Sequence, residues 1–154
     1  MPSGAEVIAK AREYLGTPHE NQGRVKGKKL DCVGLALCVA EELGIRDKNG
    51  EPILRSQHND YSGQPIGEDL LRICRSRLIE KTLPLAPGDV LVIAADPKGA
   101  GKDATHLAIA CFIGNIPAAI HAYAGGRQRV VEHVLDHRWM RRIRGVFRFP
   151  GVDS

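Results

Sequence analysis

One cysteine and two histidines occupy positions in this sequence from which they could carry out nucleophilic chemistry. Cys32 directly follows Asp31, a residue type favoured at helix N-caps, at the point where an apolar helical pattern begins. At the first position of a helix, unpaired backbone N–H groups and the positive end of the helix dipole favour a thiolate. The carboxylate of Asp31 opposes that ionisation, so a cationic partner such as a protonated histidine is needed. The sequence therefore predicts that Cys32 is a nucleophile paired with a histidine.

His106 is the predicted partner because it opens an apolar strand. Strand alternation places it on the same face as Ala108 and Ala110, and we expect the helix that begins at Cys32 to pack on that face of small side chains. His106 would then accept the thiol proton as a general base. His121, on the next strand, would hold the tautomer and orientation of His106. The predicted constellation is one cysteine and two histidines.

Each of these residues, taken alone, also has a plainer interpretation. A lone cysteine near a helix start is more often a small buried hydrophobe, and a lone strand histidine more often makes one structural hydrogen bond. The three residues together favour catalysis over these alternatives. The remaining cysteines, Cys38, Cys74 and Cys111, lie in apolar patterns and are predicted to pack in the core.

Two further histidines raise the question of a metal. His133 and His137 are four residues apart, a spacing that could place both imidazoles on one helical turn and suit zinc. The segment has no Glu-x-x-His motif, and the arginines between residues 138 and 142 would repel a cation. We therefore predict no metal site and no cofactor.

The elements that must position these residues change in type along the chain. Helical patterns run from the capping box of Ser3 and Glu6 to Leu15, from Asp31 to Leu43, and from Glu68 to Leu78, with a basic loop over residues 17–30 and a long polar loop over 45–67. Alternating patterns then predict strands over residues 90–94, 105–113, 119–123, 129–134 and 142–149. Helices followed by strands with short turns indicate an α+β fold, with N-terminal helices packed on a central antiparallel sheet of about five strands. We expect a single domain over residues 1–154.

Composition narrows the classes of protein. The chain has 154 residues, 43% of them hydrophobic and 26% charged, which excludes a fibrous or disordered protein. The net charge of +4 favours anionic partners, and the 5% aromatic content leaves few side chains to stack on bases, which disfavours nucleic acid as a partner. The first residues lack a basic region followed by an apolar core, and no apolar stretch is long enough to span a membrane. We expect synthesis in the cytoplasm without a secretion signal.

Several short motifs carry a family resemblance that spans nearly the whole chain. They are Leu15-Gly16-Thr17-Pro18, Asp31-Cys32-Val33-Gly34-Leu35, Pro87-Gly88-Asp89-Val90, His106-Leu107-Ala108-Ile109 and Ile120-His121-Ala122. With these motifs the sequence resembles the NlpC-type cell-wall cysteine peptidases, particularly the single-domain versions encoded with phage tails. The resemblance implies a papain-like fold and cleavage of the D-glutamyl to diaminopimelate bond of peptidoglycan stem peptides. It implies that Cys32, His106 and His121 are catalytic.

The resemblance also implies residues that bind substrate. Asp31 stands where family members hold a free substrate amine, His19 where many have a tyrosine, and Val33 where many have a serine. The implied partners are stem peptides and other tail proteins, and the implied location is a virion tail acting on a host wall. Two alternatives stay open. One is a catalytically weak structural or binding module of a tail, and the other is an amidase or acyltransferase that uses the same Cys–His pair.

Overall fold

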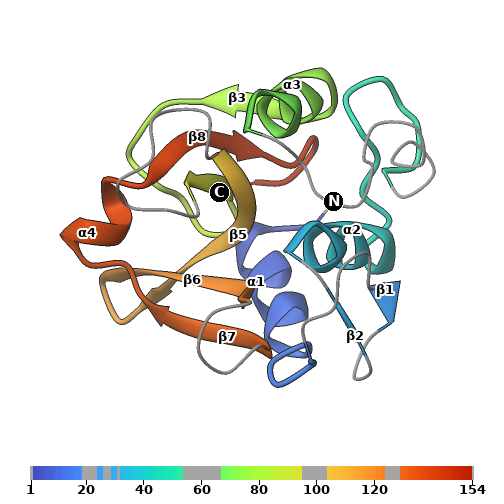
Figure 1. Cartoon of the computed structure of the whole chain (residues 1–154). Helices are drawn as coiled ribbons and strands as arrows, with labels where there is room; N and C mark the ends of the chain where they lie inside the picture. The colour runs from blue at the N-terminus through green and yellow to red at the C-terminus, as the bar shows by residue number, and fades with distance from the viewer. Residues whose placement is uncertain are drawn as a thin grey trace.

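The computed structural model describes most of the chain. It covers residues 2–18, 24–25, 29–30, 32–53, 67–94, 104–123 and 129–153. The predicted helix-then-strand order is confirmed, with three helices in the first half and the main sheet in the second (Figure 1). In the described part of the chain, no helix combines the length and apolar character needed to cross a membrane.

Four helices are described. They are α1 (Gly4–Arg12), α2 (Cys32–Glu42), α3 (Gly67–Arg77) and the short α4 (His137–Met140). The capping box is confirmed at the start of α1, where the side chain of Ser3 accepts a hydrogen bond from the backbone N–H of Glu6 at 3.1 Å. The single turn α4 was not predicted, because four residues are too few to produce a helical hydrophobic period.

The strands form two sheets. They are β1 (Arg24–Val25), β2 (Lys29–Leu30), β3 (Ile79–Lys81), β4 (Val90–Ala94), β5 (Ala104–Ile113), β6 (Ile116–Tyr123), β7 (Arg129–Val134) and β8 (Ile143–Arg148). β1 and β2 pair within the segment predicted to be a basic loop. The other six form an antiparallel sheet in the order β3-β8-β4-β5-β6-β7, one strand more than the approximate number expected from the sequence. The additional strand, β3, has only three residues and follows α3 almost directly.

The two faces of the sheet have different neighbours. On the face that we call the helix face, Leu107, Ile109 and Ile120 join one apolar core with the buried residues of α1, α2 and α3. On the other face, Ala108 and Ala110 join a second, smaller core with residues close to α4. Figure 1 shows α4 at the far side of the molecule from α2.

The prediction that α2 packs on Ala108 and Ala110 is therefore wrong. The helix covers the larger side chains at Leu107 and Ile109, one residue out of phase with the expected pair. Burying these larger side chains removes more apolar surface from water than burying alanines would, and this favours helix packing on the Leu107 face. Because residues alternate between faces, His106 lies on the same face as Ala108, near the first residue of β5. We call this side the histidine face.

Candidate active site

Cys32 begins α2, as the sequence predicts. Its side chain lies outside the described part of the structure, and so do the residues His19 and Asp31. The backbone nevertheless locates the start of the helix. Val33 and Leu107, the residues that follow Cys32 and His106, line one cavity of about 60 Å³. The start of α2 therefore lies beside the start of β5.

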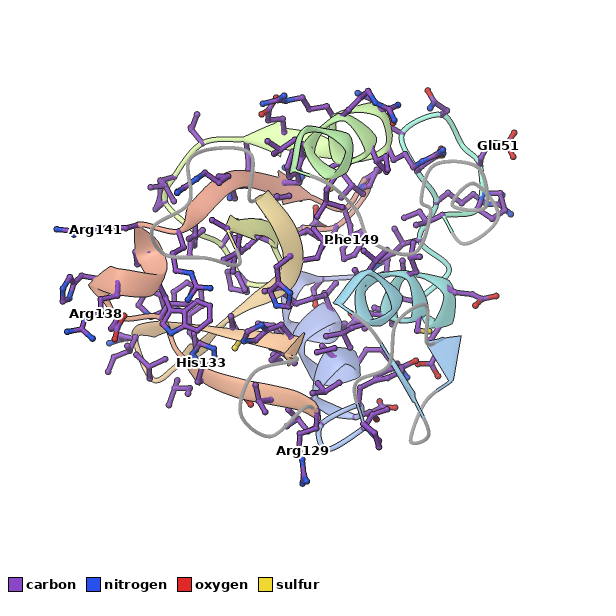
Figure 2. The ribbon with its side chains drawn as sticks, in the orientation of Figure 1. Glu51, Arg129, His133, Arg138, Arg141 and Phe149 are labelled. Atoms are coloured by element: carbon purple, nitrogen blue, oxygen red, sulfur yellow. The ribbon has the colours of Figure 1, made fainter. Side chains whose placement is uncertain are left out.

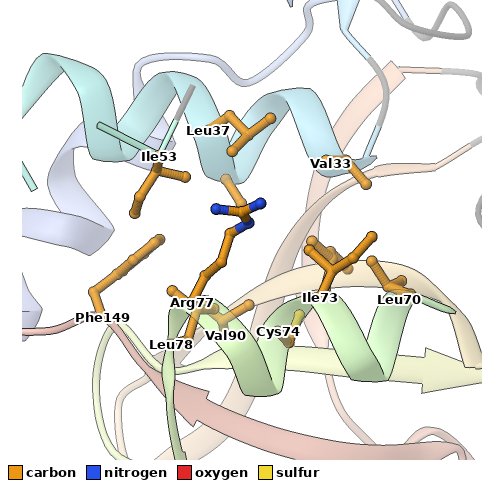
Figure 3. Close-up of a pocket in the computed structure, with 12 residues that line it drawn as sticks. Val33, Leu37, Ile53, Leu70, Ile73, Cys74, Arg77, Leu78, Val90 and Phe149 are labelled. Atoms are coloured by element: carbon orange, nitrogen blue, oxygen red, sulfur yellow. The ribbon is translucent and has the colours of Figure 1, made fainter. Parts of the chain in front are cut away.

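That cavity is apolar and lies between α2 and α3 (Figure 3). Val33 is 8% exposed and faces residues such as Leu70 of α3, so the contact that the structure gives it is a packing contact. Arg77 reaches across the cavity, and its guanidinium pairs with the buried carboxylate of Asp47 at 3.3 Å. This arrangement ties α3 to the segment that follows α2 and supports the position of α2.

The two predicted catalytic histidines contact each other on the histidine face. His106 lies in β5 opposite Ile93 of β4, and His121 lies in β6 one residue beyond Ile120. A hydrogen bond joins Nε2 of His106 to Nδ1 of His121. The ring centroids are 4.7 Å apart at an interplanar angle of 73°. His106 is half-buried while His121 is fully buried, so His106 is the member of the pair that can meet solvent or substrate.

Burial and neighbouring charge keep His121 neutral. Its pKa is lowered to about 2, mainly by loss of hydration, and the neighbouring His106, His133 and Arg142 contribute to the shift in the same direction. A neutral imidazole has one N–H donor and one lone pair, so it can accept a hydrogen bond from His106. His121 can therefore orient His106 without competing for its proton.

A third imidazole, His133 of β7, continues the row. Its Nε2 lies 2.7 Å from Nε2 of His121, and its Nδ1 lies 2.9 Å from the backbone oxygen of Val134. Figure 2 shows His133 between the sheet and the segment that carries α4. The helical turn that could have been shared with His137 is not formed, because His133 lies within β7 and His137 begins α4.

Sequence reasoning missed His133 as a member of the row. A usable signal was present, because β6 and β7 are consecutive strands and an antiparallel pairing of the two predicted segments brings their histidines together. In the observed register His133 lies opposite Ala119, two residues before His121 and on the same face. What was missing was the register, which the tertiary structure supplies.

An aromatic ring and a cation cover the row. The Trp139 ring centroid lies 4.7 Å from that of His133 and 5.6 Å from that of His121. Arg142 lies over the Trp139 ring at 4.0 Å, and its Nε donates to the backbone oxygen of Ala94 at 2.8 Å. His106 and His133, at the two ends of the row, are each half-buried, and His121 between them is fully buried.

The other cysteines that the structure describes pack in the core, as predicted. Cys38, Cys74 and Cys111 are all buried. Burial raises the pKa of Cys111 to about 12, and the adjacent carboxylate of Glu132 contributes to that increase. A thiol with such a pKa is not a nucleophile near neutral pH. Among the residues described, no cluster of three or more His, Cys, Asp or Glu side chains is arranged to hold a metal ion.

The fold is similar to that of several solved proteins of the NLP/P60 and NlpC types. One is a lipoprotein-like protein of the NLP/P60 family from Staphylococcus aureus, with 21% identity and a TM-score of 0.59 over 95% of this chain. Another is the NlpC/p60 domain of the peptidoglycan hydrolase SagA, with 23% identity and a TM-score of 0.56 over 94% of this chain and 97% of that domain. A third is an NlpC protein from Trichomonas vaginalis, with 18% identity and a TM-score of 0.63 over 95% of this chain.

These likenesses establish an NlpC/P60-like α+β fold. The chain spans 41% of the Staphylococcus protein and 44% of the Trichomonas protein, so it corresponds to less than half the length of each. An N-acetylmuramoyl-L-alanine amidase from Bacteroides uniformis has the same general fold, with 16% identity and a TM-score of 0.53. Neither a protein-family model nor a curated protein matches the sequence.

Proposed function

We propose that this protein is a cysteine peptidase that hydrolyses peptidoglycan stem peptides through Cys32, His106 and His121. The observation that carries the proposal is the hydrogen-bonded imidazole pair on β5 and β6, close to the start of a helix whose first residue is a cysteine. The likeness in fold to NlpC/P60 domains supports the choice of substrate class.

The proposed reaction begins with proton transfer from the thiol of Cys32 to His106. Because Nε2 of His106 is bonded to His121, Nδ1 is the nitrogen assigned to the thiol. The thiolate attacks the amide carbonyl carbon, and the oxyanion that forms is stabilised by backbone N–H groups at the start of α2. His106 then returns the proton to the leaving amine as the C–N bond breaks. Water hydrolyses the resulting thioester and restores the free thiol.

The bond assigned to this reaction is the D-glutamyl to diaminopimelate amide. The sequence motifs around Cys32 and His106 support that assignment, and Asp31 and His19 are the proposed contacts for substrate. The likeness to the Bacteroides amidase supports a second candidate, cleavage of the bond between muramic acid and L-alanine. Mass analysis of muropeptides after digestion separates the two, because the first reaction releases a free amine on diaminopimelate and the second releases one on L-alanine.

The test of catalysis compares two cysteine variants of the same helix. Cys32→Ala is expected to abolish the release of new amines from purified sacculi while the melting temperature stays near that of the wild type. Cys38→Ala, which removes a buried thiol of α2, is the matched control and is expected to retain cleavage. Equal activity of the Cys32→Ala and wild-type proteins would refute the proposal.

The competing proposal is a structural or binding module of a phage tail with an inactive site. Rates of alkylation by iodoacetamide distinguish the two, because a catalytic thiol has a lowered pKa and reacts faster than buried thiols. We expect Cys32 to react well before Cys111, whose pKa is raised by burial. If Cys32 reacts no faster than Cys38, Cys74 and Cys111, the structural role is the better description.

The proposed place of action is the tail of a phage or a phage-like particle. The support for it is the resemblance of the sequence motifs to tail-encoded members of the NlpC type. Immunodetection on purified particles, compared with the soluble fraction of the producing cell, tests this location independently of activity.

A further inference from the structure

We propose that His133 is a positioning residue that fixes which ring nitrogens of His121 and His106 carry protons. Together with the backbone oxygen of Val134, it makes the three imidazoles a directional chain that ends at the base. The inference rests on the proposed function for its catalytic consequence. Its structural content, a set of three tautomers, can be measured without any turnover.

The backbone oxygen of Val134 sets the direction of the hydrogen bonds along the row of imidazoles. This oxygen lies 2.9 Å from Nδ1 of His133, and a carbonyl oxygen can only accept a hydrogen bond. Nδ1 of His133 must therefore be the protonated nitrogen. In the neutral ring, Nε2 of His133 is then left with the lone pair.

The lone pair of His133 determines the tautomer of His121. The two Nε2 atoms are 2.7 Å apart, and a hydrogen bond at that distance needs one donor and one acceptor. Since Nε2 of His133 is the acceptor, Nε2 of His121 must carry the proton. Nδ1 of His121 then holds its lone pair.

The same step repeats between His121 and His106. Nδ1 of His121 accepts, so Nε2 of His106 donates and carries the proton. Nδ1 of His106 is left with the lone pair and becomes the nitrogen that can remove a thiol proton. With the opposite tautomer at His121, Nε2 of His106 would hold the lone pair and Nδ1 the proton, so His106 could not act as the base at that atom.

The surroundings suppress other ways to satisfy these bonds. His121 is fully buried, so little room remains for a water molecule to replace His133 as its acceptor. The groups that face it are His106, His133, Trp139 and Arg142. Trp139 supplies an apolar ring and Arg142 a positive charge, and both disfavour a second proton on the imidazole of His121.

The direct test is to assign the tautomers by ¹⁵N NMR of the imidazole rings, using the Cys32→Ala protein to prevent any reaction. We expect a proton on Nδ1 of His133, on Nε2 of His121 and on Nε2 of His106 at neutral pH. Any other neutral tautomer at His133 or His121 would overturn the proposal. Since the measurement needs no substrate, it stands even if the protein proves not to be a peptidase.

The functional test uses two substitutions at the same position. His133→Phe keeps a ring but removes the acceptor, and kcat/KM is expected to fall roughly tenfold, mainly through kcat. His133→Gln places a carbonyl oxygen near the position of Nε2, and it is expected to restore most of the activity and the wild-type tautomer of His121. His137→Phe is the matched control, because His137 is exposed on α4, and it is expected to behave like the wild type.

The outcomes separate a positioning role from a merely structural one. Loss of the acceptor should leave a mixture of tautomers at His106 and change the shape of the acid limb of the pH–rate profile. If the Phe and Gln variants have equal kcat/KM and the same His106 tautomer as the wild type, His133 does not position the base. If the Phe variant unfolds, the Gln variant and the wild-type NMR spectra still decide the question.

Discussion

The two faces of the β5–β6–β7 region are built from alternate residues of the same strands but have opposite chemical character. Ile120 faces the helix core, and its neighbour His121 faces the imidazole row. On β7, Glu132 faces α1, where it forms an ion pair with Arg12, and the next residue, His133, joins the row. A single residue step along a strand therefore separates packing from candidate chemistry.

This difference shows how the fold can keep the site intact. The helix face excludes water over a large apolar core, and that burial stabilises the sheet. The histidine face buries polar rings, which is tolerated because each ring nitrogen that lies inside the row has a hydrogen-bond partner. Stability and reactivity should accordingly respond to different substitutions on one strand.

Truncation of two neighbouring residues of β6 should affect activity and stability separately. His121→Ala is expected to reduce kcat/KM roughly 100- to 10,000-fold, because it removes the group that orients the general base. Ile120→Ala is expected to lower the free energy of unfolding by about 2–5 kcal/mol, since it leaves a cavity in the helix core. Muropeptide hydrolysis and denaturant unfolding measure the two effects. Comparable losses of activity for the two folded variants would contradict the separation of the faces.

As the pH falls, protonation should destabilise the histidine face at a higher pH than it destabilises the helix face. His121 has a pKa lowered from 6.5 to about 2 by burial and by the positive groups around it. The unfolded chain binds a proton below pH 6.5 that the folded chain does not bind, so the free energy of unfolding should decrease as the pH falls from there toward 2. The slope for one proton is about 1.4 kcal/mol per pH unit.

Comparing His121→Leu with the wild type by urea unfolding isolates this contribution. Between about pH 6 and about pH 5, the free energy of unfolding of the variant should depend less steeply on pH than that of the wild type, because the contribution of His121 is missing. The exposed His137→Leu protein is the control and should retain it. Parallel curves for the His121→Leu and wild-type proteins would show that His121 titrates normally.

Removal of the ion pair on the helix face is expected to change the free energy of unfolding least. Nη2 of Arg12 lies 2.8 Å from Oε2 of Glu132, and the Arg12 side chain is 44% exposed. Glu132→Gln should therefore lower the free energy of unfolding by no more than about 1 kcal/mol. The hydrogen bonds from Arg12 lower the pKa of Glu132 from 4.5, so its stabilisation is present above pH 4.5 and lost as the pH falls below it.

The Glu132→Gln protein should also keep the wild-type slope above pH 4.5 and the wild-type kcat/KM. Urea unfolding across the two pH ranges, at low and at high salt, measures both points. A large loss of activity would mean that the helix face takes part in the chemistry.

Much of the fold follows from local patterns. The side chain of Ser3 and the apolar spacing that follows it predict α1, and the alternation around residues 90–94 predicts β4 with its correct bounds. The position of Cys32 at a helix start and the contact between His106 and His121 were also predictable, because each depends on a helix cap or on neighbouring strands. The short elements β3 and α4 were missed because three or four residues carry too little periodicity.

Local patterns in the sequence were sufficient to predict the longer helices and strands and the alternation of side chains along each strand, since these depend on chain neighbours. Only the tertiary structure decided that α2 covers Leu107 rather than Ala108, and that His133 meets His121. Both outcomes depend on strand register and helix packing between segments far apart in the chain. The largest total apolar burial selects those arrangements, and no local pattern records it.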